Sequence, residues 1–319
     1  MNDYRAGVRL VEVRRCGIVE SVHTGHVVVV DASGQVRRRA GHPDGTFFAR
    51  SALKPLQALG MLRAGWRPDD DGDLALACAS HVGSAMHRER IAAALTSAGL
   101  DEDDLGCPPE LPMGTAEQRA HLAAGLGPSR LAMNCSGKHA AMLRTCLVNG
   151  WATATYLDPA HPLQQALAAT VAESCAEPVA ETAVDGCGAP LFGVSLTGVA
   201  RAYSRLATAT GGPEQAVVAA MQAHPALVEG HAEAVTRLLR AVPGLVAKDG
   251  AEGVFAASLP DGTGVAVKVD DGAARAAEAV MAQVLRELGV RADVLDELVA
   301  APVLGGGVPV GEVRALRLP

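Results

Sequence analysis

The sequence predicts an α+β fold, and three observations support this prediction. Segments in which apolar and polar residues alternate, as they do in strands, occur near both ends of the chain. The long middle part, from residue 51 to about residue 242, shows helical spacing, with Gly or Pro between most segments. The chain has 319 residues, of which 49% are hydrophobic and 20% charged, enough for a packed core. Strands at both ends are most simply placed in one antiparallel sheet, with the helices inserted between them.

The N-terminal part is predicted to form a β-meander. Residues 8–13 alternate like a strand, residues 18–23 follow, and residues 26–31 form the most apolar stretch of the three. Gly25 and the segment 31–34 carry residues typical of turns, so each is expected to end a strand.

The middle part is predicted to be helical after Ser51. Seven further helices are expected over residues 86–98, 115–125, 136–148, 161–176, 190–208, 214–222 and 231–241. Gly150 is expected to end the third of these, because glycine readily takes the left-handed conformation found after many helices. The acidic residues 69–73 are expected to form a solvated loop, with a calcium site as the alternative.

Strands return in the C-terminal part. Residues 253–258 and 264–269 read as strands joined by a hairpin turn, a long helix follows over 273–288, and residues 312–317 form a last strand. This order predicts a single domain, 1–319, made of two lobes. The predicted sheet lobe comprises residues 1–49 with 245–319, and the predicted helical lobe comprises residues 50–244.

The composition argues against several classes of protein. Aromatic residues make up only 3% of the chain, so stacking platforms for single-stranded nucleic acid are not expected. The net charge of −7 also disfavours a nucleic-acid partner. The N-terminus lacks the apolar region of a signal peptide, and no apolar run of about 18 residues is present, so no membrane partner is expected. Seven cysteines without a framework spacing indicate reduced thiols in a cytoplasmic protein.

The segment Arg50–Lys54 contains a serine followed three positions later by a lysine. On a helix these two positions share a face, so the Ser51 hydroxyl and the Lys54 amine can meet. Such an amine removes the serine proton when desolvation or a neighbouring cation lowers its pKa. Pro55 is tolerated only near the start of a helix, which places Ser51 at an N-terminus, where the helix dipole favours negative charge. The alternative is an N-cap serine beside a solvated lysine.

Four further segments carry side chains suited to catalysis or metal binding. Residues 78–84 are small and polar, and residues 133–139 place a thiol, a hydroxyl, an amine and an imidazole together at a predicted helix start. Residues 184–190 place Cys187 between two glycines, which let the backbone approach closely. The fourth is Lys268, a positive residue on an otherwise apolar strand. The alternatives are ordinary loops and caps for the first three, and an outward lysine on an edge strand for the last.

Together these segments resemble the L-asparaginase II family of the type first known from Rhizobium. The resemblance covers almost the whole chain and rests on five ordered motifs, Arg50–Pro55, Cys78–His81, Asn134–His139, Asp185–Gly188 and Gly264–Lys268. It implies a fold like that of serine β-lactamases and glutaminases, and a homodimer. It also implies hydrolysis of the side-chain amide of L-asparagine to L-aspartate and ammonia.

The resemblance also implies roles for individual residues. The two serine–lysine pairs of the family match Ser51 with Lys54 and Ser80 with Lys268. The family's zinc ligands match Cys135, Lys138 and Cys187, and residues that support substrate binding match Arg50, Asn134, His139 and Asp185. Two thiolates suit zinc, whereas lysine is a rare ligand because its amine must first lose a proton, so on chemistry alone His139 is the alternative third ligand. Of the two serines, we expect Ser51 to carry the acyl group.

Two other classes of function remain open from the sequence. One is a different serine–lysine acyl hydrolase, such as a glutaminase or a β-lactamase-like enzyme. The other is a non-catalytic binding protein in which a metal pins the loops of an inactive enzyme scaffold. The presence of two thiols and an amine argues against the first class, because such a hydrolase needs no metal site. A non-catalytic protein is expected to have lost a serine or a lysine of the two pairs, and all four are present.

Overall fold

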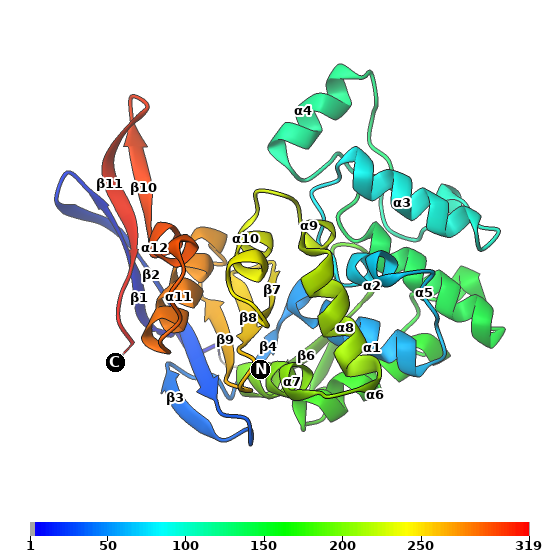
Figure 1. Cartoon of the computed structure of the whole chain (residues 1–319), viewed down its shortest axis with the longest axis horizontal. Helices are drawn as coiled ribbons and strands as arrows, with labels where there is room; N and C mark the ends of the chain where they lie inside the picture. Colours follow the sequence, from blue (N-terminus) through cyan, green and yellow to red (C-terminus); the bar gives the residue numbers. More distant parts are fainter. Residues whose placement is uncertain (1–3, 319) are drawn as a thin grey trace. The chain divides into compact units, whose positions relative to one another are not determined.

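The computed structural model of the chain describes residues 4–318 (Figure 1). The limits 1 and 319 of the predicted domain lie outside the described residues. Two compact units are present, and each is described by itself. The sheet unit comprises the chain up to Ala52, Val194–Thr208 and the chain from Arg237 onward. The helical unit comprises Leu53–Gly193 and Ala209–Thr236.

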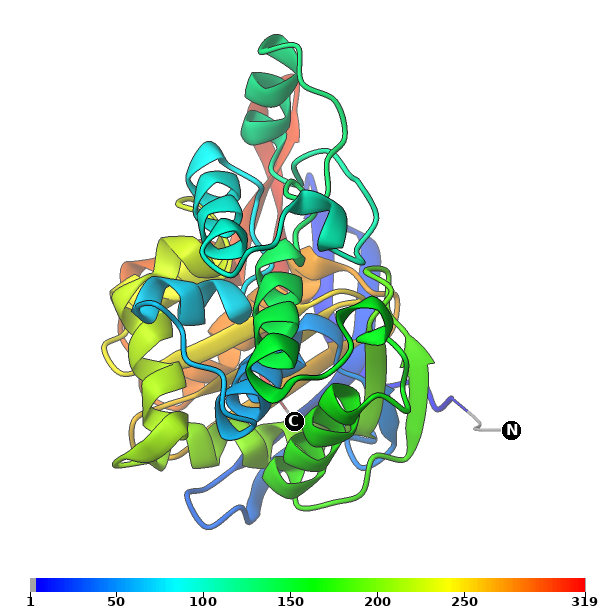
Figure 2. The ribbon, with the colours of Figure 1, turned by 90° about the vertical axis from the view of Figure 1, so that its right-hand side faces the viewer.

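The sheet unit is built around one antiparallel sheet with the strand order β10-β11-β1-β2-β9-β8-β7, and β3 also pairs with β2. Its strands are β1 (Val8–Arg15), β2 (Ile18–Val30), β3 (Val36–Ala40), β7 (Val246–Gly250), β8 (Val254–Ser258), β9 (Gly264–Val269), β10 (Ala300–Gly305) and β11 (Val308–Ala315). The pairing of β1 with β11 puts the first and last strands of the chain side by side, as blue and red strands in Figures 1 and 2. This arrangement confirms the predicted α+β class and the sheet formed from both termini.

The prediction of a turn at Gly25 is wrong, because β2 continues through this residue. Gly25 pairs with Val8 of β1 on one side and with Val269 of β9 on the other. A Cβ atom at Gly25 would lie 2.3 Å from the carbonyl oxygen of Lys268. Glycine is therefore needed here for close approach of neighbouring strands rather than for a turn.

The central strands of this sheet are covered on both faces. Every residue of β8 and β9 is buried, and alternate side chains of a strand point to opposite faces. Helices α7 (Leu196–Thr208) and α11 (Ala274–Glu287) both pack on these two strands, and α12 (Asp293–Val299) packs on α11. The predicted helix over 273–288 is thereby confirmed.

The prediction of one helix over residues 190–208 is only half right. Residues 190–195 form strand β6 (Pro190–Ser195), and the helix α7 begins at Leu196. All six residues of β6 are buried, and β5 (Glu181–Val184) pairs with it in antiparallel register. A short, wholly buried strand shows no alternation, so its apolar run cannot be told from part of a helix by periodicity.

The helical unit confirms the other helical predictions. Its helices are α1 (Lys54–Arg63), α2 (Asp71–Ala77), α3 (Ala85–Thr96), α4 (Thr115–Ala123), α5 (Ser136–Asn149), α6 (Pro162–Cys175), α8 (Gly212–Ala223) and α9 (Pro225–Val228), while α10 (Ala234–Ala241) and β4 (Thr46–Phe48) complete the chain. Gly150 follows α5 in the left-handed conformation with φ 65°, as expected. Helices α1, α2 and α5 pack on one another and form the centre of this unit.

The acidic residues 69–73 are not a solvated loop, because α2 begins inside them. The Asp70 side chain accepts hydrogen bonds from the backbone N–H groups of Gly72 and Asp73 and caps the helix. Asp73 is buried and forms ion pairs with Arg90 at 3.0 Å and Arg144 at 3.2 Å. Within residues 4–318, no three His, Cys, Asp or Glu side chains are placed to hold a metal ion, so the calcium alternative finds no support.

No helix in the described part of the chain is both long enough and apolar enough to cross a membrane.

Candidate active site

Ser51 lies on a short 3₁₀ helix (Arg50–Leu53) that leads directly into α1. Arg50 has φ 53°, a left-handed conformation that is uncommon for a residue with a side chain. Within the sheet unit, Tyr203 of α7 donates a hydrogen bond of 2.7 Å to a carbonyl oxygen of this turn. Gly250 of β7 also lies close to this turn, because a Cβ atom on Gly250 would be 2.5 Å from the carbonyl oxygen of Ala49. The turn that presents Ser51 is therefore held in a strained conformation by a helix and a strand.

Lys54 is the first residue of α1 and is almost completely buried, with 1% of its surface exposed. Its Nζ donates hydrogen bonds to the Ser80 hydroxyl at 3.0 Å and to the Ala79 carbonyl oxygen at 2.5 Å. Pro55 is accommodated next to it in the first turn of the helix. The alternative of a solvated lysine is therefore wrong, because within the helical unit Ser80 and Ala79 both accept hydrogen bonds from this buried amine.

The loop that carries Ser80 joins α2 to α3 and is fixed by backbone hydrogen bonds on both sides. The Ser80 N–H donates to the Val228 carbonyl at 2.9 Å, and the next residue, His81, donates to the Asn134 carbonyl at 3.1 Å. Ser80 is 4% exposed. The Ser80 hydroxyl is thus held by the loop itself as well as by the Lys54 amine.

Three predicted metal ligands are gathered in the helical unit at the start of α5. The Lys138 Nζ lies 3.2 Å from the Cys187 sulfur, and Cys187 raises the pKa of the Cys135 thiol, which donates to the Asn134 Oδ1 at 3.0 Å. All three side chains are buried. The nearby Cys135 thiol and the positive charge of Lys138 hold the pKa of Cys187 well below its usual range. Although burial acts in the opposite direction, Cys187 and Cys135 raise the pKa of Lys138.

The donor chemistry of this cluster fits zinc, which prefers sulfur and nitrogen ligands in a tetrahedral arrangement. His139, the alternative third ligand, points its Nδ1 to the Tyr156 hydroxyl at 2.6 Å. Cys135, Cys187 and His139 do not form a three-donor metal site, since none is present among the described His, Cys, Asp and Glu side chains. The identity of a third protein ligand stays a prediction.

The loop that presents Cys187 is a tight turn closed by Asp185. The Asp185 carboxylate accepts the N–H of Gly186 at 2.8 Å, and its backbone carbonyl accepts the N–H of Gly188 at 2.8 Å. Gly188 has φ 84°, which only glycine adopts readily. Gly188 therefore allows the chain to reverse next to the thiol, and the close backbone approach expected at these glycines stays a prediction.

Lys268 lies on β9, between β2 and β8, and not on an edge strand. It is 9% exposed and faces His26 of β2 in the strand register, so the alternative of an outward edge lysine is wrong. Its Nζ donates to the Val269 carbonyl oxygen at 2.5 Å. Burial lowers the pKa of Lys268, while the nearby carboxylate of Asp270 opposes that change.

The predicted site residues thus divide between the two units. The sheet unit contains Ser51, Arg50 and Lys268, and the helical unit contains Lys54, Ser80, Cys135, Lys138, Cys187, Asn134, His139 and Asp185. The pairing of Ser51 with Lys54 and of Ser80 with Lys268 stays a prediction. Sequence reasoning missed the role of Ala79 and Tyr156 as hydrogen-bond partners of the site, because backbone carbonyls and distant tyrosines leave no local signal.

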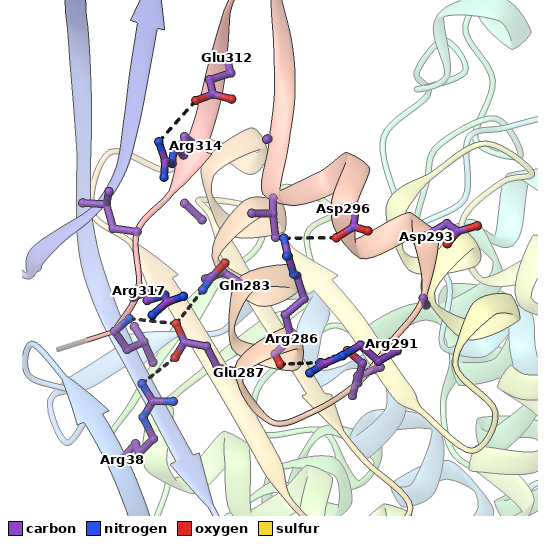
Figure 3. Close-up of a pocket in the computed structure, with 17 residues that line it drawn as sticks. Arg38, Gln283, Arg286, Glu287, Arg291, Asp293, Asp296, Glu312, Arg314 and Arg317 are labelled. Atoms are coloured by element: carbon purple, nitrogen blue, oxygen red, sulfur yellow. Dashed lines mark hydrogen bonds and ion pairs between the residues drawn. The ribbon is translucent and has the colours of Figure 1, made fainter.

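A large cavity of the sheet unit lies elsewhere, between β11, α11 and α12 (Figure 3). It has a volume of about 1360 Å³, and none of the predicted site residues lines it. Its charged side chains pair with one another, as in Arg38 with Glu287 at 2.7 Å and Arg286 with Asp296 at 3.3 Å. This surface is an open, charged groove rather than the predicted active site.

The α+β fold contains a buried lysine amine within hydrogen-bond distance of a serine hydroxyl. The chain belongs to the L-asparaginase II family, whose sequence profile matches residues 11–315. This family is a family of amidohydrolases. No curated protein matches the sequence significantly.

Three solved structures are similar in fold, each with 16% sequence identity. Mglu in its native form has a TM-score of 0.46, and the match covers 84% of this chain and 64% of that one. EstCE1, a hydrolase with promiscuous acyltransferase activity, has a TM-score of 0.40 with coverage of 77% and 88%. A β-lactamase, Mb2281c from Mycobacterium bovis, has a TM-score of 0.37 with coverage of 83% and 95%. This chain thus spans less than two thirds of the length of the Mglu chain.

Proposed function

We propose that this protein hydrolyses the side-chain amide of L-asparagine to L-aspartate and ammonia through a serine acyl-enzyme. Membership of the L-asparaginase II family supports asparagine hydrolysis in general. The observation that carries the finer proposal is the contact of the buried Lys54 amine with the Ser80 hydroxyl at 3.0 Å. A buried amine in direct contact with a hydroxyl is the arrangement that serine–lysine proton transfer requires.

The reaction begins with proton transfer from Ser51 to the neutral Lys54 amine. Burial disfavours the charged form of this amine, which makes it available as a base. The Ser51 oxygen then bonds to the side-chain carbonyl carbon, and the C–N bond breaks after the nitrogen has received a proton. Ser80, which touches Lys54, passes that proton toward the leaving ammonia together with Lys268. Water then attacks the ester, which releases aspartate and returns the proton to the serine.

In this proposal the substrate is held by four polar residues. Asp185 takes the α-ammonium group, and Arg50 takes the α-carboxylate by charge. Asn134 and His139 supply further polar contacts from the start of α5. Cys135, Lys138 and Cys187 would hold a zinc ion, which would act as a Lewis acid weakened by the two thiolates and would help to place the substrate. The enzyme acts as a homodimer in the cytoplasm, where its seven free cysteines stay reduced.

Ammonia release from L-asparagine by the purified protein tests the proposed function. L-Glutamine and the β-lactam nitrocefin are measured beside it, because a glutaminase or a β-lactamase-like enzyme would prefer one of these. Faster turnover of either than of L-asparagine overturns the substrate assignment. Absence of turnover on all three, with correctly folded protein, favours a non-catalytic binding protein instead.

Recognition of the amino-acid head group is tested with two further compounds. Aspartate β-hydroxamate keeps the α-amino acid and the acyl carbon, so it should be hydrolysed. An amide without the α-amine should be poor, because Asp185 would lose its partner at a cost of about 1–3 kcal/mol. Equal turnover of simple aliphatic amides would contradict the assigned role of Asp185.

A further inference from the structure

His81 connects the loop of Ser80 with the segment of Cys135, and no role has been assigned to it so far. The residue is completely buried. Its backbone N–H donates to the Asn134 carbonyl at 3.1 Å, and its ring Nε2 lies 2.9 Å from the Ser136 hydroxyl. These two contacts fall on either side of Cys135. Within the helical unit, His81 therefore connects the loop of Ser80, which contacts Lys54, with the segment that carries Cys135.

The direction of the side-chain hydrogen bond follows from the partners of Ser136. Its hydroxyl also lies 2.9 Å from the Leu131 carbonyl oxygen, which can only accept. Because a hydroxyl has one proton, it donates to Leu131 and must accept from His81. The Nε2 atom of His81 therefore carries the ring proton. Its Nδ1 atom is bare and has no hydrogen-bond partner among residues 4–318.

The ring is fixed on its face as well as at its edge. His87 of α3 stacks on it, with ring centres 4.9 Å apart and an angle of 14° between the planes. His87 itself donates from Nε2 to the Ala226 carbonyl oxygen at 3.0 Å, so it is also held in one orientation. Burial lowers the pKa of both rings, which keeps the stacked pair uncharged. The His81 ring has no freedom to rotate away from Ser136.

We propose that His81 is a positioning residue for the amide hydrolysis. Its Nε2–H holds the turn Asn134–Ser136, and with it Cys135, against the loop that places Ser80 on Lys54. The inference rests on the proposed function for its effect on catalysis, but the hydrogen bond itself does not. Loss of this bond should let the two segments shift apart, so that the Ser80 hydroxyl and Cys135 lose their alignment.

A pair of amide variants tests this role. In His81→Gln the side-chain N–H reaches about as far as histidine Nε2, whereas in His81→Asn it is too short to reach Ser136. We expect His81→Asn to lower kcat/KM by about tenfold or more, mainly through kcat, and His81→Gln to restore most of it. The matched control is His121. Its Nε2 donates a hydrogen bond of 2.8 Å to the carbonyl oxygen of Gly127, and neither residue belongs to the predicted site. The same two substitutions there should leave the kinetics of the folded protein unchanged.

Hydrogen–deuterium exchange is the readout that does not depend on activity. Residues 79–82 and 131–137 should exchange faster in His81→Asn and in Ser136→Ala than in His81→Gln. If His81→Asn fails to fold, Ser136→Ala tests the same bond from the other side. The proposal would be overturned if the variants that fold had the kinetics and exchange rates of the wild type. It would also be overturned if His81→Asn and His81→Gln lowered kcat/KM equally. An inactive wild type would refute the proposed function instead, while the exchange comparison still decides whether His81 holds the two segments.

Discussion

The Nζ atom of Lys54 lies 3.0 Å from the Oγ atom of Ser80, although the two residues are 26 positions apart in the chain. Three positions before this lysine stands Ser51, the serine that we assign as the nucleophile. In the proposed mechanism one buried amine therefore serves two hydroxyls, as the base for Ser51 and as the proton donor to Ser80. Substitution of the amine should consequently be as harmful as substitution of either serine.

Ser51→Ala should abolish asparaginase activity and leave the fold and the metal content unchanged. Lys54→Ala should have nearly the same effect on kcat, because residues that act as a unit are not additive. Steady-state kinetics of ammonia release check this, with circular dichroism and metal analysis as controls for the fold. If Ser51→Ala kept more than about a tenth of the wild-type kcat, a barrier change below roughly 1.4 kcal/mol, Ser80 would replace it as the nucleophile.

The zinc site should depend on both thiols. The purified protein, prepared without a histidine tag, should carry up to one zinc ion per chain, and Cys135→Ala or Cys187→Ala should lose it. The matched control is Cys146→Ala, because Cys146 is a buried cysteine of the same helix α5 outside the cluster. Elemental analysis gives the result. An ion held by two thiolates is a weak Lewis acid, so removal of zinc should raise KM more than it lowers kcat.

A zinc-free wild type whose activity does not rise when zinc is added would remove the metal from the mechanism. The serine–lysine chemistry would stand in that case, because none of its steps passes through the ion. Loss of zinc from Cys146→Ala as well would show that the substitutions act through the fold of α5 and not through metal ligation.

The pH dependence of kcat/KM should report the environment of Lys268. Burial lowers the pKa of this amine, so it becomes neutral at a lower pH than an exposed lysine does. Activity that needs the neutral amine should rise with pH through that pKa. Asp270, Glu252 and Asp271 act in the opposite direction and raise it. In Asp270→Asn the rise should therefore move to lower pH.

The control for this shift is Asp261→Asn, which removes the same charge from the exposed turn between β8 and β9. Its pH profile should coincide with that of the wild type. A shift of the Asp270→Asn profile to higher pH, or the same shift in both variants, would contradict the assignment of Lys268 as a proton carrier.

Gly250→Ala should destabilise the protein and impair catalysis together. The added Cβ atom would lie 2.5 Å from the carbonyl oxygen of Ala49, in the turn that presents Ser51. Such a clash forces a backbone shift that costs about 1–3 kcal/mol. Denaturant unfolding measures the loss of stability, and kcat measures the displacement of Ser51. Gly127→Ala is the control and should leave stability and kcat nearly unchanged, because the φ of Gly127 is not in the left-handed region and a Cβ atom there meets nothing within 4 Å.

A large part of the architecture was predictable from local patterns. The alternation in 8–13 and 264–269 predicted strands, and the helical spacing after Ser51 predicted the block of helices. The prediction of β2 failed at Gly25, since a glycine that ends a strand and a glycine that admits a neighbouring strand look the same in sequence. Strand β6 was missed because a wholly buried strand has no alternation to detect.

The sequence by itself determined which chemical groups this protein possesses and which of them lie close along the chain. Ser51 precedes Lys54 by one helical turn, and Cys135 precedes Lys138 by the same spacing, whatever the rest of the fold does. Only the tertiary structure decided that Lys54 meets Ser80 and that Cys187 meets Lys138. The physical reason is that local spacing follows from the geometry of a single helix, which any short window reveals. Contacts between distant segments depend instead on how buried faces pack and on where each buried amine or thiol finds a polar partner.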